Sequence, residues 1–413
     1  MTDTQPHLST RMTDIAGRGA DAWAIADRAA EDRAAGLDVA SLCLGDTSFD
    51  TPPEITAALI HAVQTGRTHY APVPGTTGLR RAIAAAQLRH TGLTADAVQV
   101  TVFGGAQNAL FAALMAVAGP GDEVVLLAPW YATYEATAKA TGATIVALPI
   151  SAPSSGARID PAALDASISP KVRAIVVNGP NNPGGHILGS TDLQTIADVA
   201  IRHDIWVISD EVYRTSVFDS AFQSVAALPG MAARTIIVNS LSKSHAMTGW
   251  RLGWTIAPVT TAQALENLAQ CMLFGSPTFI QDAAEVALSP ALDPAMASFA
   301  EALHDRRDLM AGALARMEGL QFQVPEGGMF CFVDVSATGL DGGTFADRLY
   351  AATGLAVVPG FAFGPAMEPF IRLSFSSDEA TITEGMTRLR HFVATCRNTS
   401  NPQDPAPKNK VNP

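Results

Sequence analysis

The sequence has few cysteines, little charge and no long apolar run. Cys43, Cys271, Cys331 and Cys396 lie far apart, so no CxxC pair indicates zinc or redox chemistry, and they are too few for a disulfide scaffold. Reduced, mostly structural cysteines are typical of a cytoplasmic protein. Charge, glycine or proline interrupts every apolar stretch before it reaches transmembrane length, and the polar start MTDTQPHLSTRMTD lacks the apolar core of a signal peptide. We therefore expect a cytoplasmic protein with no membrane segment and no metal.

The low charge also limits the class of partner. Charged residues make up 16% of the chain and the formal net charge is -12, which argues against a broad nucleic-acid surface. A small-molecule site depends on local charge and is not excluded. With 413 residues, 48% of them hydrophobic, the chain is long enough to bury a large core and to form two or three domains.

The two ends of the chain differ from the rest. Residues 1–10 predict a flexible arm. Residues 399–413, TSNPQDPAPKNKVNP, are rich in Pro, Asn and Lys and have no apolar period, which predicts a disordered tail.

Short β-branched runs alternate with Ala-rich stretches between about residues 97 and 258. This alternation predicts an α/β fold with a mainly parallel sheet flanked by helices, and the near-continuous apolar runs are typical of buried parallel strands. The expected strands are 98–103, 122–128, 143–150, 172–180, 205–211 and 234–240, and the expected helices are 106–118, 131–142 and 190–203.

The pattern changes past about residue 290 and predicts a second, smaller α+β domain. Helical stretches at 294–318, 343–353 and 377–396 are separated by the runs GGMFCFVDV, VVPG and IRLSFS. A helical segment near 20–36 is expected to join this part. We thus predict a large domain over 46–290 and a small domain made of 11–45 plus 291–398.

The loop SLSKSHAMTGWRLGW (240–254) follows a predicted strand, where ligands of open parallel sheets are bound. Ser240, Ser242, Lys243 and Arg251 provide two hydroxyls, an ammonium and a guanidinium, which suit a phosphate dianion. Lys243 also suits imine formation with an aldehyde, because a desolvated lysine beside other cations has a lowered pKa. Taken alone, such a lysine is more often a solvated surface residue.

Two further segments end predicted strands with polar residues. VISDEVY places Asp210 at a strand end with Tyr213 three residues later, although an aspartate there is equally typical of a helix cap. NGPNNPGG (178–185) is a tight loop that presents the amide of Asn182, although such a string is usually only a loop.

Three other segments complete the set of candidates. FGGAQNAL (103–110) places Gly105, Ala106 and Gln107 at a helix start that suits a phosphate, although a glycine pair is more often only a turn. APWYATY (128–134) offers an aromatic ring for stacking, although aromatics commonly pack in a core. Arg372 in the apolar strand FIRLSFS needs a partner, either a ligand carboxylate or a structural ion pair.

The order of these segments resembles that of class I and II aminotransferases of the pyridoxal-phosphate (PLP) fold type I. The likeness extends from about Gly17 to Cys396, and its specific motif is S-x-S-K followed by arginine eight residues after the lysine. The resemblance implies that Lys243 forms an imine with the cofactor, that Asp210 pairs with the pyridinium nitrogen, and that Asn182 and Tyr213 bond the phenolic oxygen. It likewise implies the phosphate ligands Ser240, Ser242, Arg251 and the backbone of Gly105, Ala106 and Gln107, and Arg372 as ligand of the substrate carboxylate.

Two early segments and one late segment add to the resemblance. LCLGDTSFDTPPEI (42–55) is similar to a loop whose glycine, here Gly45, contacts the substrate carboxylate. THYAPVPGTTGLR (68–80) is similar to a segment whose tyrosine, here Tyr70, reaches the phosphate of the neighbouring subunit. FGSPTFIQ (274–281) matches a segment near the partner's site, so the resemblance implies a homodimer with shared active sites.

The chain departs from the family pattern at a few positions. Gly184 stands where Thr or Ser is usual, and Asp46-Thr47 replaces the commoner acidic-Pro pair. By spacing from Pro129 the stacking ring should be Tyr131, with Trp130 as the alternative.

Three stretches, NSLSKSHAMTGWR, ENLAQCMLFGSPTFIQDAA and PEGGMFCFVDV, are similar to arginine–pyruvate transaminases. The expected activity is therefore ping-pong transfer of an amino group from an L-amino acid, such as arginine, to a 2-oxo acid such as pyruvate. An aspartate or aromatic aminotransferase and a PLP-dependent cysteine-conjugate β-lyase remain alternatives. A PLP-binding transcription regulator would need a DNA-binding domain ahead of this region.

A guanidinium substrate should meet a carboxylate, and Asp14, Asp21 and Asp46 are the candidates.

Overall fold

The computed structural model describes residues 9, 12, 15, 18–150, 159–219 and 221–399. The predicted arm, apart from Ser9, and the predicted tail from residue 400 onward lie outside the described residues. Within the described part, no helix is long and apolar enough to cross a membrane, and no cluster of three or more His, Cys, Asp or Glu residues is arranged to bind a metal ion. The cytoplasmic location stays a prediction.

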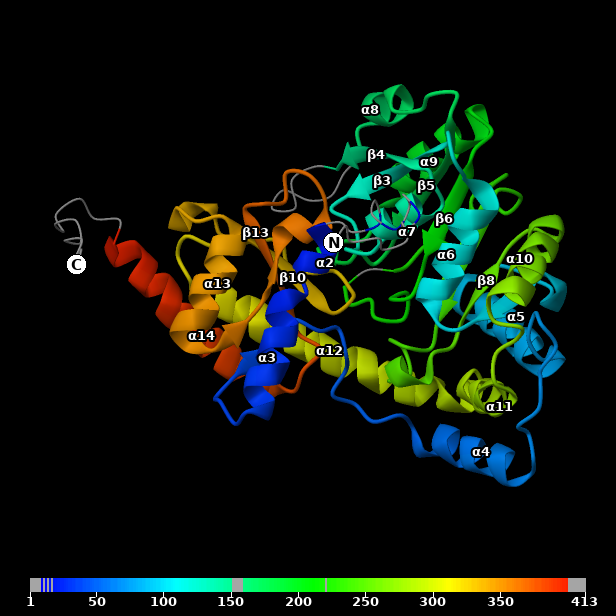
Figure 1. The fold of residues 1–413 in the computed structure, drawn as a ribbon, viewed down its shortest axis with the longest axis horizontal. Coiled ribbons are helices and arrows are strands. Elements are labelled where there is room, and N and C mark those ends of the chain that lie inside the picture. Colours follow the sequence, from blue (N-terminus) through cyan, green and yellow to red (C-terminus); the bar gives the residue numbers. More distant parts are fainter. Residues whose placement is uncertain are drawn as a thin grey trace, which may run out of the picture.

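A seven-stranded sheet forms the centre of the larger part of the molecule (Figure 1). β8 runs antiparallel to its neighbours β2 and β7, and the other pairs are parallel. In spatial order the strands are β2 (Val100–Phe103), β8 (Gly253–Ile256), β7 (Thr235–Ser240), β6 (Trp206–Asp210), β5 (Val172–Asn178), β3 (Glu123–Ala128) and β4 (Thr144–Pro149).

Helices cover both faces of this sheet because its strands are apolar on both sides. Along β3, Val124 and Leu126 belong to one buried cluster, whereas Val125 and Leu127 belong to another, as the two-residue period of a strand requires. The first cluster includes residues of α6 (Ala106–Val117), α7 (Tyr134–Ala140) and α10 (Val259–Met272), and the second includes residues of α8 (Pro161–Ala166) and α9 (Ser190–Arg202).

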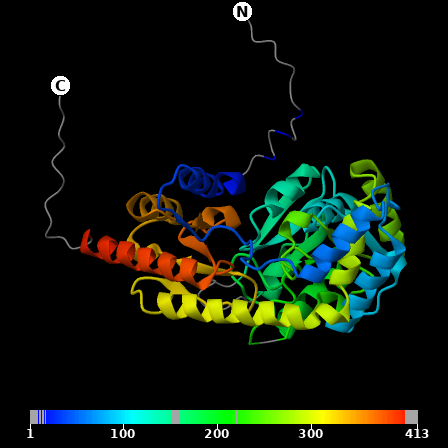
Figure 2. The ribbon, with the colours of Figure 1, turned by 90° about the horizontal axis from the view of Figure 1, so that it is seen from below.

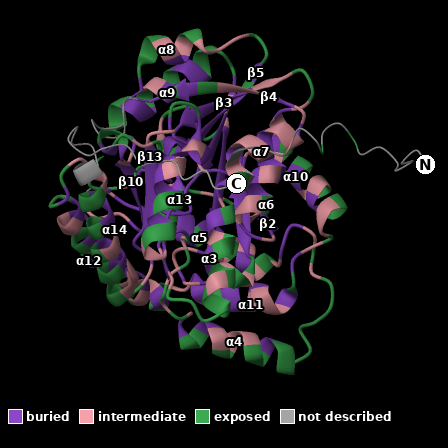
Figure 3. Ribbon diagram, turned by 60° about the vertical axis from the view of Figure 1, so that its left-hand side comes forward, coloured by how far each residue is buried: buried purple, intermediate pink, exposed green. Residues whose placement is uncertain are grey.

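A third cluster closes the β2 end of the sheet. Val100 and Val102 of β2 and Trp254 of β8 pack there with apolar side chains of three helices. α4 packs against α11 and presents an exposed outer side (Figure 3). The three helices are α4 (Pro53–Gln64), α5 (Thr77–Thr91) and α11 (Thr278–Ala287).

The second part of the molecule contains two small sheets and the first and last helices of the described residues. α12 and α14 lie side by side along one flank (Figure 2). Its buried cluster joins Leu42 and Ile25 near the N-terminus to Leu303 and Leu389 near the C-terminus. The sheets are β12-β13-β10-β9 and β1-β11, with β1 (Ala40–Ser41), β9 (Gln321–Phe322), β10 (Phe330–Asp334), β11 (Leu355–Ala356), β12 (Val358–Pro359) and β13 (Phe370–Ser374). The helices are α2 (Arg18–Asp21), α3 (Ala24–Ala34), α12 (Asp293–Leu314), α13 (Gly342–Thr353) and α14 (Glu379–Thr399).

The α/β class and the mainly parallel sheet are confirmed. Each predicted strand of the large part agrees with an observed one to within two residues at either end. β8 was not predicted, because its residues directly follow the loop with the binding residues and were read as part of it. The last helix extends to Thr399, three residues beyond its predicted end. The domain boundaries stay predictions.

Candidate active site

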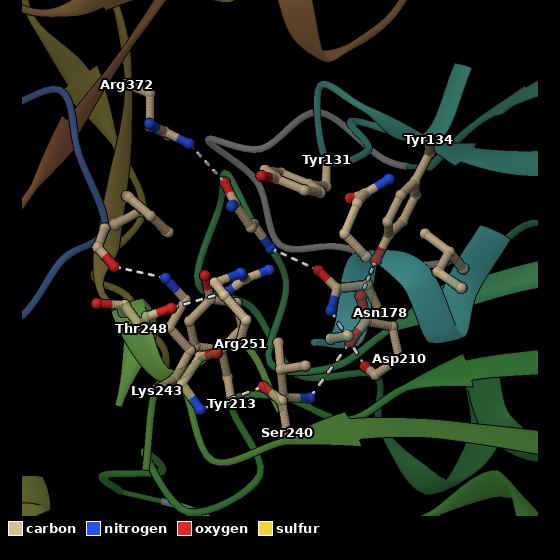
Figure 4. A pocket seen from close by; sticks show the side chains of 18 of the residues that line it. Tyr131, Tyr134, Asn178, Asp210, Tyr213, Ser240, Lys243, Thr248, Arg251 and Arg372 are labelled. Carbon is tan, nitrogen blue, oxygen red and sulfur yellow. Dashed lines mark hydrogen bonds between the residues drawn. The ribbon is translucent and has the colours of Figure 1, made fainter. Parts of the chain in front are cut away.

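The carboxyl ends of neighbouring strands bring polar side chains to one edge of the large sheet. β5 ends at Asn178, β6 at Asp210 and β7 at Ser240, and Asn178 pairs in register with Asp210. These ends border a cavity of about 180 Å³ (Figure 4). Its walls are Trp23, Gly45, Ala106, Gln107, Leu110, Tyr131, Tyr134, Asn178, Asn182, Asp210, Val212, Tyr213, Ser240, Ser242, Lys243, Thr248, Arg251, Phe330 and Arg372.

One corner of the cavity is suited to an anion. Gly105 precedes α6 with φ +94°, and an added Cβ would lie 2.5 Å from Nη2 of Arg251, so only glycine fits. Arg251 is held by a 2.8 Å hydrogen bond from its Nη1 to the carbonyl oxygen of Thr248. The guanidinium thus lies against the start of α6, whose first N–H groups favour negative charge. Ser240 and Ser242 line the same cavity.

The side chain of Gln107 is hydrogen-bonded to two threonines. Its side-chain amide donates to Thr137 Oγ1 at 2.8 Å, and its Oε1 accepts a 2.8 Å hydrogen bond from Thr133 Oγ1. Both ends of the amide are therefore engaged within the protein.

A buried carboxylate, Asp210, is also part of the wall. Its Oδ2 accepts a 2.5 Å hydrogen bond from the Tyr134 hydroxyl, and its Oδ1 accepts a 3.3 Å bond from the backbone N–H of Val212. Burial raises the pKa of Asp210 from 3.8 to about 6, while the bond from Tyr134 opposes the shift. The cavity therefore has an anion in one wall and cations in another.

Asn182 links two other residues of the site. Its Oδ1 accepts a 3.0 Å hydrogen bond from Nη1 of Arg372, and its side chain also hydrogen-bonds the Tyr213 hydroxyl. Burial raises the pKa of Tyr213, with the nearby Tyr131 adding to the effect, so the hydroxyl remains protonated. Asn178 fixes the loop by accepting from the backbone N–H of Asn182 at 2.8 Å.

Lys243 extends between the two parts of the molecule. Its Nζ donates a 2.6 Å hydrogen bond to the carbonyl oxygen of Gly45. Burial lowers the pKa of Lys243 from 10.5 to about 8; Asp46 opposes this shift, and Arg372 and Arg251 add to it. A lysine with this pKa has a large neutral fraction near pH 8, which a nucleophile or general base requires.

Arg372 is buried without a carboxylate partner among the described residues. The side chain is 1% exposed, and its guanidinium lies 4.1 Å from the ring centre of Phe330 and 5.3 Å from that of Trp23. Nη2 donates to the carbonyl oxygen of Cys43, whereas Nε has no partner. Burial lowers the pKa of Arg372 to about 10. A buried, incompletely paired guanidinium is a binding group for a carboxylate.

The structure separates the two aromatic candidates. Tyr131 lines the cavity, and burial raises its pKa. Trp130 does not line it; its ring is 4% exposed, lies in the core of the large part and has an unpartnered Nε1.

Other predicted residues lie at or beyond the edge of the cavity. Tyr70 is 85% exposed, contacts Phe274 edge to face at 5.2 Å and does not line the cavity. Asp46 is exposed, and its Oδ1 accepts a 2.7 Å hydrogen bond from Thr248 Oγ1. Asp21 is exposed at the end of α2, and Asp14 lies outside the described residues.

Sequence reasoning missed several residues of the cavity. Tyr134 and Asn178 lie within the segments that were singled out, and their position at a helix start and a strand end was the available signal. Trp23, Thr248 and Phe330 also line the cavity, and their roles depend on contacts between distant segments.

Comparison with known proteins places the chain among aminotransferases. The family model "Aminotransferase class I and II" matches residues 38–389. The arginine–pyruvate transaminase AruH of Pseudomonas aeruginosa is 45% identical over 375 residues, 91% of this chain and 95% of the relative. An aspartate aminotransferase of Musicola paradisiaca is 37% identical over 376 residues, 90% and 94% of the two chains. The solved structure of Thermus thermophilus aspartate aminotransferase with maleate has a TM-score of 0.89, 31% identity, and coverage of 94% of this chain and 100% of that one.

Proposed function

This chain belongs to the class I and II aminotransferases, and from that premise we propose that it transfers the amino group of L-arginine to pyruvate. The cofactor of the family is pyridoxal phosphate. When bound, it supplies an aldehyde that combines with amines and a protonated ring that withdraws electrons. The cavity fits this group, because Gly105 lets the Arg251 guanidinium lie against the start of α6, where a phosphate would be held, and the carboxylate of Asp210 suits a pyridinium nitrogen.

We assign the cofactor contacts on this basis. The phosphate would be held at the corner of the cavity that suits an anion, with Tyr70 supplied by a neighbouring subunit. Asp210 would face the ring nitrogen, Asn182 and Tyr213 the phenolic oxygen, and Tyr131 the ring face. The corner that suits an anion comprises Ala106, Gln107, Ser240, Ser242 and Arg251, which line the cavity, together with Gly105, which lies against Arg251.

Lys243 and Arg372 would act on the amino-acid substrate. Arg372, with the backbone at Gly45, binds the α-carboxylate, and this orients the α-carbon. The neutral Nζ of Lys243 then removes the α-proton, and its pKa of about 8 supplies the neutral amine near physiological pH. The observation that carries the proposal is the buried Arg372, which no carboxylate of the described residues neutralises.

Arginine as donor rests on the relative with 45% identity and on the position of Asp46. The Asp46 carboxylate is held by Thr248, which lines the cavity, and is close enough to raise the pKa of Lys243. A carboxylate at this edge is suited to the distal guanidinium of a substrate whose α-carboxylate is at Arg372. Asp21 is exposed at the end of α2 and, among the described residues, has no hydrogen bond or ion pair with a residue of the cavity wall.

A substrate screen tests this function. Purified holoenzyme is assayed with arginine, aspartate, alanine and aromatic amino acids, each with pyruvate and 2-oxoglutarate. We expect the largest kcat/KM for arginine with pyruvate, and parallel lines in double-reciprocal plots, as a ping-pong reaction gives. Activity confined to aspartate would exclude the arginine assignment, and release of pyruvate and ammonia from cystathionine without an acceptor would favour a β-lyase.

A homodimer with shared active sites is the second part of the proposal. Tyr70 and the adjoining Phe274 are 85% and 51% exposed, an unusual state for two aromatic rings in contact. Exposed Ile60 and Val63 on α4 add apolar surface in the same part of the chain. An interface here would bury these side chains and bring Tyr70 to a partner's phosphate.

Mixed dimers test whether Tyr70 serves the partner. We expect Tyr70→Phe and Lys243→Ala proteins, each impaired alone, to regain activity when unfolded and refolded together, because one site of the mixed dimer then has both native residues. Each variant refolded separately and mixed afterwards is the control. Sedimentation of the native protein as a monomer at micromolar concentration, or no regain of activity, would contradict the proposal.

A further inference from the structure

Among the described residues, the carboxylate of Asp210 has one side-chain hydrogen-bond donor. The Tyr134 hydroxyl contacts Oδ2 at 2.5 Å, while the backbone N–H of Val212 contacts Oδ1 at the longer distance of 3.3 Å. Asn178 donates to the backbone carbonyl oxygen of Asp210 and therefore fixes the strand end rather than the charge. Figure 4 shows Tyr134 and Asp210 together at one side of the cavity.

Burial and a neighbouring carboxylate oppose the ionisation of Asp210, whereas the Val212 N–H and the Lys243 charge favour it along with Tyr134. Asp210 is 6% exposed, and the adjacent Glu211 is fully buried. Burial is the main cause that raises the pKa of Asp210, and the charge of Glu211 acts in the same direction. Burial raises the pKa of Glu211, while a 2.5 Å hydrogen bond from Ser224 and the nearby Arg214 favour its ionised form.

The buried hydroxyl of Tyr134 stays protonated and so remains a hydrogen-bond donor to Asp210. Its ring is 2% exposed, and burial together with the nearby Asp210 raises the pKa of its hydroxyl well above 10. The backbone is fixed at the first residue of α7, where its N–H donates to the carbonyl oxygen of Tyr131 at 2.8 Å. The ring of Tyr131 packs edge to face against the ring of Tyr134, with 5.6 Å between the ring centres. At neutral pH the Tyr134 hydroxyl therefore stays protonated and acts as the donor in its bond to the Asp210 carboxylate.

We propose that Tyr134 is a positioning residue that keeps Asp210 ionised and directed into the cavity, so that a protonated pyridine nitrogen is bound there. The inference rests on the family's cofactor and is independent of which amino acid is the donor. A hydrogen bond to a charged group is among the stronger ones in proteins, and this one is buried.

The test is Tyr134→Phe, which removes the hydroxyl and retains the ring. The measurement is binding of pyridoxal phosphate to the apoprotein, followed by the absorbance of the bound cofactor at a series of pH values. We expect the dissociation constant near pH 7 to rise about tenfold to hundredfold, the range that loss of a charge-assisted bond implies. The control is Tyr350→Phe, which removes a 2.5 Å bond to Asp32 outside the cavity and should leave binding unchanged.

The pH dependence separates positioning from a merely structural role. Native affinity should fall as the pH falls through the pKa of Asp210, about 6, because a protonated carboxyl no longer attracts a pyridinium. Loss of the Tyr134 bond raises that pKa further, so the decline in the variant should begin at higher pH. A structural role would lower the unfolding temperature and leave the decline at the same pH.

A double-mutant cycle with Asp210→Asn completes the test. If Tyr134 acts through the carboxylate, Tyr134→Phe should have little further effect on cofactor binding once Asp210 is Asn. An equal loss in both backgrounds, or a dissociation constant within twofold of native and no shift with pH, would overturn the proposal. Because no substrate is present, neither outcome depends on the arginine assignment.

Discussion

Lys243→Ala is expected to lower kcat for transamination by about 10⁴-fold, the upper end of what a positioned general base contributes. Lys243 lines the cavity, and burial lowers the pKa of its amine to about 8. Alanine leaves no side-chain amine there, and water is a poor base. The visible absorbance that the cofactor would have when bound through Lys243 should also be lost from the loaded protein.

The control for this variant is Lys171→Ala. Lys171 is exposed and lies outside the cavity, so its removal should change neither kcat nor the absorbance. Cofactor binding and the unfolding temperature of Lys243→Ala should be measured in parallel, because an inactive but unfolded variant carries no information. Normal turnover by a folded Lys243→Ala protein, or borohydride labelling of another lysine in the native holoenzyme, would refute the assignment.

The strands of the large sheet were predictable because buried parallel strands are apolar on both faces. Val124 to Leu127 read as one continuous run, and the structure divides it between two cores. β8 was not predictable in the same way. Gly253 to Ile256 continue a polar loop in sequence, and their pairing with β2 spans about 150 residues.

Site residues at strand ends were predictable because parallel strands end at a common edge. Asp210 and Ser240 end two such runs and lie together in the cavity, where Asn178 joins them from the end of a third run although only Asn182 of its loop was predicted. Tyr134 was missed because its bond to Asp210 joins positions 76 residues apart, and the sequence offered three aromatic rings in one segment. Which ring faces the cavity depends on packing. Trp130 packs in the core of the large part, closely against the backbone at Gly364.

The partner of Arg372 could not be settled from the sequence either. An arginine in an apolar strand predicts a counter-ion, and a structural carboxylate was as acceptable as a ligand. The structure surrounds the guanidinium with Phe330, Trp23 and a backbone carbonyl, and no carboxylate of the described residues is in contact. The absence of that contact, which only the assembled fold reveals, makes a ligand carboxylate the better interpretation.

Arg372→Leu is therefore expected to lower kcat/KM for amino acids by roughly 30-fold to 5,000-fold, since loss of one partner of a buried charge pair removes roughly 2–5 kcal/mol. The same substitution should not lower the stability of the fold. Burial already disfavours the charge, as its pKa of about 10 indicates, and Nε is unpartnered. An apolar side chain of similar volume should leave the unfolding temperature unchanged or raised.

Arg307→Leu is the matched control for this prediction. Arg307 is also buried, but its Nη1 lies 2.6 Å from Asp219 and donates to the carbonyl oxygen of Pro325, outside the cavity. Its replacement breaks an ion pair and should lower the unfolding temperature with little change in kcat/KM. Opposite effects of two buried arginines on stability and activity would separate a ligand-binding role from a structural one.

The carboxylate itself can be tested by changing the substrate. The native enzyme should prefer an amino acid over its amide by the same factor that Arg372→Leu loses, because the amide cannot form two charge-assisted hydrogen bonds. The variant should no longer discriminate between them. If Arg372→Leu keeps the native preference for the free carboxylate, another group binds the substrate carboxylate. The buried Arg372 would then no longer support the proposed function.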